Sequence, residues 1–131
     1  PNLQISYLGH KNAIKHYLTP MQNLELMFGS SALQNTMKWM NTLGLNKVQD
    51  ELTANLSFGQ QKKLALIRVF ASESDLIILD EPFVGLDNAS RDLLNEFLQK
   101  KLASDASLIL TSHIEPNILC SELVLSGDTD D

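Results

Sequence analysis

The stretch "LIILDEPFVGLD" at residues 76–87 decides the fold class of this chain. Its apolar run predicts a strand over 75–80, closed by Asp80 and buried on both faces of a parallel sheet. Asp80 would then lie at the carboxyl end of the strand, where open α/β sheets bind their ligands, and a carboxylate there can hold Mg²⁺ beside nucleotide phosphates. Glu81, the next residue, can act as a general base toward water. An ordinary strand exit with two acids is the alternative interpretation.

A second apolar run, "SLILTSH" at residues 107–113, predicts another buried strand over 107–112. Because the carboxyl ends of parallel strands meet at one edge of a sheet, His113 is expected at the edge that carries Asp80 and Glu81. An imidazole at that place can contact a transferring γ-phosphate. The alternative for His113 is a loop histidine with an ordinary structural partner.

The segment "NLSFGQQKKLALIRVF" at residues 55–70 predicts a long helix that begins with a polar turn. Ser57 is expected to cap the amino end of this helix. Apolar residues follow at helical spacing, and Lys62 and Lys63 are expected on the outside. The sequence therefore predicts an amphipathic helix with a capped amino end, directly before the strand that carries Asp80.

The rest of the chain alternates helices and strands with short loops, which indicates a right-handed strand–helix–strand crossover in an α/β sheet. Thr19 as N-cap, Pro20 at the first helical position and Gly29 as a stop define one helix. We expect a helical subdomain over about 12–70, attached to an α/β part over 71–131. The further expected elements are a strand over 3–8, a helix over 30–43, a helix over 88–102 capped by Asn88, and a strand over 122–126.

Composition and charge limit the class of partner. The chain has 131 residues and a net charge of −6, from 16 acidic and 10 basic residues, which argues against a nucleic-acid partner. No apolar run approaches the roughly 18 residues of a membrane-spanning helix, so a membrane role requires a partner. Cys120 is the single cysteine, which excludes an internal disulfide and fits a reducing compartment. Trp39 is expected to pack among apolar groups.

Three segments resemble, in order and spacing, motifs of the ABC-type ATPases. "LSFGQQKKLALIRVF" resembles the signature motif, "LIILDEPFVGLD" resembles Walker B with its D-loop, and "LILTSH" resembles the segment that carries the switch histidine. The resemblance implies an α/β fold, the carboxyl-terminal portion of a P-loop NTPase, with a mostly parallel sheet and a helical subdomain. It also implies that the cofactors are ATP and Mg²⁺.

The same resemblance implies roles for individual residues. Ser57 and Gly59, together with Gln60, would bind the γ-phosphate of an ATP held by a second ATP-binding subunit, and the amino-terminal dipole of the following helix would contribute. The remaining roles would be Asp80 for Mg²⁺, Glu81 for the attacking water, Asp87 for the interface between subunits, and His113 for the γ-phosphate.

Within that family, three stretches are most similar to the ATP-binding subunits of haem exporters of cytochrome c maturation. They are "YLGHKNAIKHYLTPMQNLEL" at residues 7–26, "GQQKKLAL" and "DEPF". His10 stands where most of the family carries the Q-loop glutamine and is counted with the nucleotide-binding residues; a solvated loop imidazole is the alternative. This likeness implies an energy-coupling subunit that works with an integral membrane permease and lies peripherally on the cytoplasmic face of the inner membrane. Haem itself would not touch this subunit.

The sequence also departs from the family pattern at two places. A P-loop requires G-x-x-x-x-G-K-[ST], and none of the six glycines is followed by Lys, so the chain by itself is expected to bind ATP very weakly. We expect the carboxyl-terminal two-thirds of a longer ATPase; a non-catalytic truncated module and a soluble ABC ATPase of another role are the alternatives. Phe58 stands where the family has Gly or Ala, and its ring is expected to point away from the nucleotide.

Overall fold

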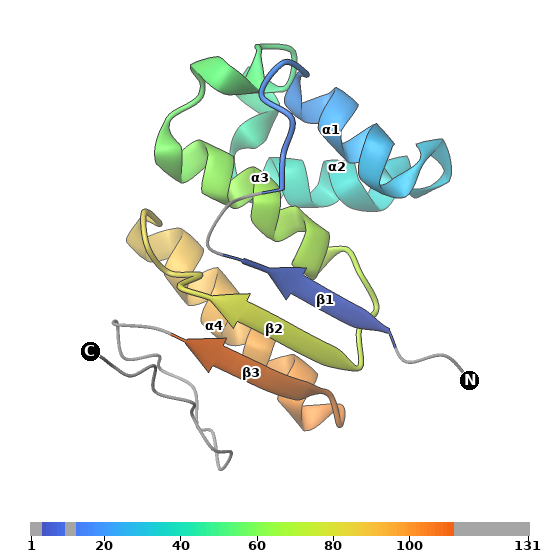
Figure 1. Ribbon diagram of the computed structural model, residues 1–131, viewed down its shortest axis with the longest axis vertical. Coiled ribbons are helices and arrows are strands. Elements are labelled where there is room, and N and C mark those ends of the chain that lie inside the picture. The colour runs from blue at the N-terminus through green and yellow to red at the C-terminus, as the bar shows by residue number, and fades with distance from the viewer. Residues whose placement is uncertain (1–3, 10–12, 112–131) are drawn as a thin grey trace.

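The structure of the protein is a computed structural model, which describes residues 4–9 and 13–111. The described strands form one parallel sheet in the order β1-β2-β3, which confirms the predicted α/β class (Figure 1). The predicted strand over 122–126 lies outside the described residues. The elements are β1 (Ile5–Leu8), α1 (Pro20–Phe28), α2 (Leu33–Thr42), α3 (Phe58–Phe70), β2 (Leu76–Asp80), α4 (Asn88–Ala103) and β3 (Ser107–Thr111), with short 3-10 turns at Ser30–Ala32, Leu45–Val48 and Thr53–Asn55.

The core lies between one face of this sheet and the helices α3 and α4. In the register of the sheet, Leu79 of β2 lies beside Leu8 of β1 and Leu110 of β3, and all three are buried. The helices supply the opposite side of the core, with buried side chains such as Leu64 of α3 and Leu94 of α4. The continuous apolar run of β2 predicted a buried strand of a parallel sheet, and β2 is the central strand, packed against helices.

The first two helices start and stop mostly as predicted. Thr19 caps α1 in a capping box, with Pro20 in the first turn, and the chain leaves α1 at Gly29 with φ of 76°. The helix expected over 30–43 is instead a 3-10 turn followed by α2. No side chain caps the backbone at the start of α2, so the tighter 3-10 turn satisfies groups that an α-helical start would leave unpaired.

Three aromatic rings hold the helices to one another. Trp39 of α2 stacks on Phe70 of α3 with ring centroids 4.6 Å apart, and Phe97 of α4 meets Phe70 edge-on at 4.9 Å. Such pairs contribute about 0.5–1.5 kcal/mol beyond the area that they bury. The expectation that Trp39 packs among apolar groups is confirmed.

A buried asparagine fixes the loop that precedes α1. The side chain of Asn23 is buried; its Oδ1 accepts a hydrogen bond from the backbone nitrogen of Lys15 at 2.7 Å, and its Nδ2 donates to the carbonyl oxygen of Lys15 at 3.0 Å. The same Nδ2 donates to the hydroxyl of Thr53, which is also buried, at 3.1 Å. One amide therefore ties the loop, α1 and the segment before α3 together.

Replacing this amide is expected to destabilise the fold. Asn23→Leu removes the hydrogen-bond partner of the backbone nitrogen of Lys15 and of the hydroxyl of Thr53, which should lower the free energy of unfolding by roughly 2–3 kcal/mol. Urea unfolding followed by circular dichroism measures the loss. The matched control is Asn35→Leu, because Asn35 is exposed and makes a single long hydrogen bond of 3.4 Å to Ala71. Equal losses for the two variants would contradict this account of Asn23.

Candidate functional site

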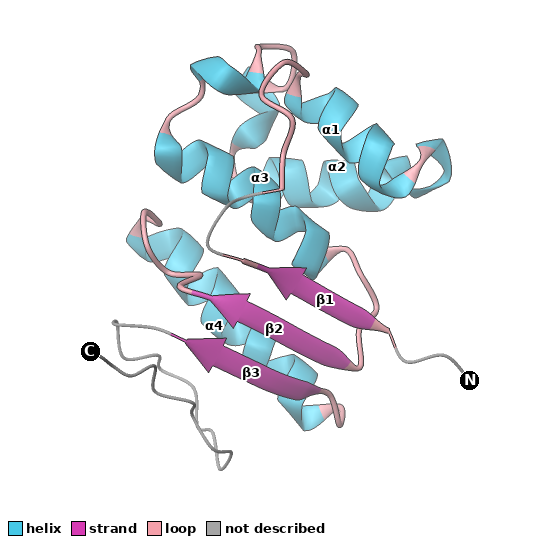
Figure 2. Ribbon diagram, in the orientation of Figure 1, coloured by secondary structure: helices cyan, strands magenta, loops and turns pink. Residues whose placement is uncertain are grey.

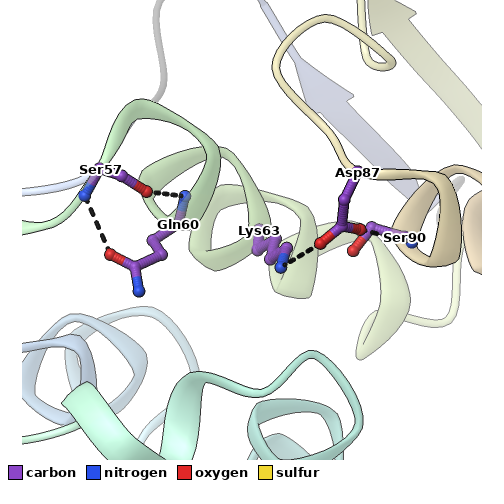
Figure 3. A network of polar contacts seen from close by, with 5 residues as sticks. All are labelled: Ser57, Gln60, Lys63, Asp87 and Ser90. Atoms are coloured by element: carbon purple, nitrogen blue, oxygen red, sulfur yellow. Dashed lines mark hydrogen bonds and ion pairs between the residues drawn. The ribbon is translucent and has the colours of Figure 1, made fainter.

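The polar turn before α3 is a closed hydrogen-bonded unit on the surface. The hydroxyl of Ser57 accepts a hydrogen bond from the backbone nitrogen of Gln60 at 3.1 Å, and Oε1 of Gln60 accepts one from the backbone nitrogen of Ser57 at 2.9 Å (Figure 3). This capping box confirms that Ser57 is the N-cap of α3. Because Ser57 is exposed, the amino end of a 13-residue helix, with its partial positive charge, is open to an anion from outside the chain.

The same turn is pressed against the loop that follows β2, hereafter the 81–87 loop. A Cβ atom added to Gly59 would lie 2.7 Å from the carbonyl oxygen of Gly85, so the two backbones touch. A Cβ added to Gly85 would lie 2.5 Å from the ring of Phe58. The ring of Phe58, 57% exposed, therefore lies over Gly85 in the same chain. Only glycine fits at either contact without a shift of the neighbouring atoms.

Gly85 also has φ of +84°, a conformation that costs other L-residues energy. Gly85→Ala is expected to lower the free energy of unfolding by about 2–3 kcal/mol, from backbone strain together with the clash against Phe58. In a double-mutant cycle, adding Phe58→Ala should remove the clash and recover part of the loss, while the backbone part remains. Urea unfolding of the four proteins measures both parts. Strict additivity would show that the ring does not lie on Gly85.

Asp87 closes the 81–87 loop and begins α4. Its Oδ1 accepts a hydrogen bond from the backbone nitrogen of Ser90 at 2.8 Å, and its Oδ2 pairs with Nζ of Lys63 at 3.0 Å (Figure 3). The predicted cap at Asn88 is wrong by one residue, because the carboxylate of Asp87 reaches the free amide of Ser90. The hydrogen bonds from Ser90, and then the Lys63 ammonium, lower the pKa of Asp87 from 3.8 to about 2.

The lowered pKa makes part of the stability depend on pH. The folded state keeps Asp87 ionised more readily than the unfolded state, so this contribution is complete above pH 3.8 and is lost as the pH falls toward 2. Asp87→Asn retains a capping side chain without the charge, and should show a shallower loss of unfolding free energy between pH 4 and pH 2. Because the carboxylate is mostly exposed, the difference should stay below about 1 kcal/mol. Urea unfolding at stepped pH tests it, and parallel pH profiles for the two proteins would contradict it.

Asp80 and Glu81 lie at the carboxyl end of β2, as the sequence predicts. Asp80 lies beside Thr111 in the register of the sheet, and the hydroxyl of Thr111 donates a hydrogen bond to Oδ1 of Asp80. The backbone nitrogen of Glu81 donates to the carbonyl oxygen of Thr111 at 2.8 Å. Glu81 has φ of 52°, a left-handed conformation that costs a non-glycine residue of order 1–3 kcal/mol and is concentrated at functional sites.

The two lysines of α3 differ from the sequence expectation. Lys62 was expected on the outside with Lys63, but its side chain is buried, and Lys63 is mostly covered by its pairing with Asp87. Burial lowers the pKa of Lys62, and the charges of Asp80 and Glu81 oppose that shift. The reason is the packing of α3: positions three and four residues after Gly59 lie on the side of the helix that meets the 81–87 loop.

The residues present fit one side of a site for Mg²⁺ and phosphate. Carboxylate oxygens are the ligands that Mg²⁺ prefers, and it usually keeps several waters and takes one or two carboxylates plus substrate phosphates. The hydrogen bond from Thr111 fixes the orientation of Asp80. Among residues 4–9 and 13–111, no group of three or more His, Cys, Asp or Glu side chains is arranged to hold a metal ion. If Mg²⁺ binds here, Asp80 would supply one carboxylate, and water and substrate phosphate would supply the other ligands.

The structure places the predicted residues in two groups. Asp80 and Glu81 lie at the end of the sheet, while Ser57, Gly59 and Gln60 form the exposed turn of α3. Asp87 is connected to that helix through Lys63. His10 and His113 lie outside the described residues. The contacts that Lys63, Gly85 and Thr111 make with the candidate site residues were not predicted from the sequence. For Lys63, the pair of basic residues directly after the turn was the available signal.

Comparison with known proteins gives consistent matches. A family model described as ABC transporter matches residues 1–84. The cytochrome c biogenesis ATP-binding export protein CcmA of Idiomarina loihiensis is 38% identical over 128 residues, which cover 96% of this chain and 56% of that protein. An ATP-binding subunit of an ABC transporter superposes with a TM-score of 0.74 at 25% identity, covering 85% of this chain and 49% of the other.

A second solved structure shares the fold. It is a dimeric ATP-binding cassette in a post-hydrolysis state, bound to ADP and Pi, with a TM-score of 0.69 at 19% identity, and the match covers 86% of this chain and 53% of the other. The chain spans about half the length of the curated relatives it matches. Within the described residues, no helix has the length and apolarity needed to cross a membrane.

Proposed function

Because the chain belongs to the ABC transporter family, whose members hydrolyse ATP, we propose that it forms part of the energy-coupling ATPase subunit of a haem exporter for c-type cytochromes. The observation that carries the ATPase part is the position of Asp80 and Glu81 at the carboxyl end of β2 in a parallel sheet. The choice of haem export rests on the likeness to cytochrome c biogenesis export proteins at 31–39% identity.

In this proposal, the residues of the sheet edge act on the phosphate and on water. Asp80, oriented by Thr111, would hold Mg²⁺, which neutralises charge on the phosphates when it is bound. Glu81, held by its backbone bond to Thr111, would orient the attacking water and accept its proton. His113 would contact the γ-phosphate, and His10 would contribute near the nucleotide.

The turn of α3 would serve a second ATP-binding subunit. Ser57, Gly59 and Gln60 lie at the exposed start of α3, so they would contact the γ-phosphate of an ATP held by that subunit, and Asp87 would lie near the interface. The dimeric cassette that shares this fold supports such an arrangement. We also propose the division into a helical subdomain over about 12–70 and an α/β part over 71–131.

The membrane partner would be an integral permease. Tyr17 and Leu26, 73% and 64% exposed, lie on the helical side of the molecule and would contribute to its docking surface. The protein would then be peripheral on the cytoplasmic face of the inner membrane. The net charge of −6 disfavours a role on nucleic acid.

The decisive experiment uses a chimera in which this chain replaces the matched 56% of the Idiomarina protein. We expect the chimera to hydrolyse Mg²⁺–ATP and to co-purify with the membrane permease partner of that relative. An ATPase that does not retain the permease would refute the transport role. A folded chimera without hydrolysis would favour a non-catalytic module.

A further inference from the structure

The side chain of Gln61 crosses the chain segment that leads into the turn at residues 57–60. Its Nε2 donates a hydrogen bond to the carbonyl oxygen of Thr53 at 2.9 Å and a longer one to the carbonyl oxygen of Leu56 at 3.5 Å. The backbone nitrogen of Gln61 donates to the carbonyl oxygen of Ser57 at 2.9 Å. This one residue of α3 therefore bonds to three positions in the segment directly before the helix.

The segment that Gln61 crosses sets the direction in which α3 begins. Leu56 has φ of −78° and ψ of 154°, and Ser57 has φ of −64° and ψ of 162°, so both are extended and lie outside the helix. Rotation about these backbone dihedral angles would tilt the start of α3 relative to the 3-10 turn at Thr53–Asn55. The hydrogen bond from Gln61 to Thr53 spans both extended residues and therefore limits that rotation.

The partner of Gln61 is itself anchored to another helix. Thr53 is buried, and its hydroxyl accepts a hydrogen bond from Nδ2 of Asn23 in α1 at 3.1 Å. Its backbone nitrogen donates to the carbonyl oxygen of Leu18, before α1, at 2.9 Å. In Figure 2, α3 lies between the sheet and the helices α1 and α2, so these bonds join its start to the helical side of the molecule. Thr53 therefore provides a fixed point from which Gln61 can orient the turn.

The turn that is held in this way exposes backbone donors. The amides of Phe58 and Gly59 belong to the first turn of α3 and have no partner within the helix, whereas the amide of Gln60 donates to the hydroxyl of Ser57. Such amides stabilise an anion only when they point to the place that its oxygen occupies. A displacement of about 1 Å can cost roughly 100-fold in rate. The direction in which α3 begins therefore decides how well this turn can act.

We propose that Gln61 is a positioning residue of the candidate site, which aims the turn at residues 57–60 toward the γ-phosphate held by a second subunit through its hydrogen bonds to Thr53 and Leu56. The proposal rests on the proposed function for the identity of the anion. Gln61 acts through the backbone of the turn and does not itself touch phosphate. Because donors of this kind count most where charge develops in the transition state, loss of Gln61 should affect kcat more than the apparent affinity for ATP.

Amide hydrogen exchange on the full 131-residue chain tests the orienting role without nucleotide or partner. Gln61→Met keeps the length of the side chain and removes the donor. We expect exchange at the amides of Leu56 and Gln60 to become about tenfold faster, while the amide of Asn23 in α1 changes by less than about twofold. Gln61→Lys retains a donor at the end of the side chain and should restore most of the protection. Unchanged exchange at Leu56 and Gln60 in Gln61→Met would overturn the proposal.

Turnover by the chimera tests the effect on catalysis. Gln61→Met should lower kcat for Mg²⁺–ATP about tenfold and change KM by less than about threefold, and Gln61→Lys should recover most of the rate. The matched control is Gln22→Met, because Oε1 of Gln22 accepts a hydrogen bond from the backbone nitrogen of Thr19 at 2.9 Å in the capping box of α1. It should lose stability in urea to a similar extent and keep its kcat.

Equal loss of kcat in Gln61→Met and Gln22→Met would show that Gln61 has only a structural role and would overturn the proposal. A folded Gln61→Met chimera with unchanged kcat would do so as well. An unaltered chimera that does not hydrolyse ATP would reject the proposed function instead, and amide exchange in the 131-residue chain would then decide by itself whether Gln61 orients the turn.

Discussion

Glu81→Gln is expected to lower ATP turnover by the chimera about 10²–10⁴-fold, the contribution typical of a positioned general base. The amide keeps the size of the side chain and can still hydrogen-bond water, but it cannot accept the proton. The hydrogen bond from the backbone nitrogen of Glu81 to Thr111 does not depend on the carboxylate, so it should persist in the variant. Steady-state release of phosphate at saturating Mg²⁺–ATP measures the effect, and nucleotide affinity should change little.

Glu73→Gln is the matched control, because Glu73 is exposed and precedes the same strand. This variant should turn over ATP like the unaltered chimera. If Glu81→Gln lost less than about tenfold while Glu73→Gln was silent, the proton would be going to another group. Losses of similar size in both variants would indicate a general effect of charge instead of a base at residue 81.

The elements that local chemistry specifies could be predicted from the sequence. The run before Asp80 admits a buried strand, and the turn before α3 has both members of a capping box, Ser57 and Gln60, three residues apart. Such features depend on neighbours in the chain. The position of Asp80 could be predicted as well. It directly follows the apolar run, and in a parallel sheet the carboxyl ends of the strands all lie at one edge.

Contacts between distant segments could not be read in the same way. Lys62 was assigned to the outside because it is charged, yet it is buried where α3 meets the 81–87 loop, with the acids of the sheet edge to compensate it. Likewise, nothing next to Phe58 in the sequence indicates Gly85 as its neighbour. The N-cap of α4 was predicted one residue too late, at Asn88 instead of Asp87, because both residue types are good N-caps.

These contacts change how the turn at residues 57–60 is interpreted. In the sequence, Phe58 is a bulky residue inside a segment that resembles a phosphate-binding motif. In the structure its ring lies on Gly85, next to the backbone contact between Gly59 and Gly85. The Lys63–Asp87 pair, one helical turn further, joins the same two segments. The turn at residues 57–60, which would contact nucleotide on another subunit, therefore packs against the 81–87 loop of its own chain.

Ser57→Arg is expected to lower turnover by the chimera roughly 100-fold or more, whereas Phe58→Ala should retain or improve it. Arginine removes the hydroxyl that accepts from the nitrogen of Gln60 and fills the exposed entrance to the helix amino end, so the turn can no longer approach phosphate. Alanine at residue 58 removes a ring that points to Gly85 and leaves the amide of Gly59 in place. Phosphate release measures both, and urea unfolding separates loss of activity from loss of fold. A Phe58→Ala chimera that is folded but inactive would show that the ring belongs to the nucleotide site, and a fully active Ser57→Arg chimera would remove the turn from the mechanism.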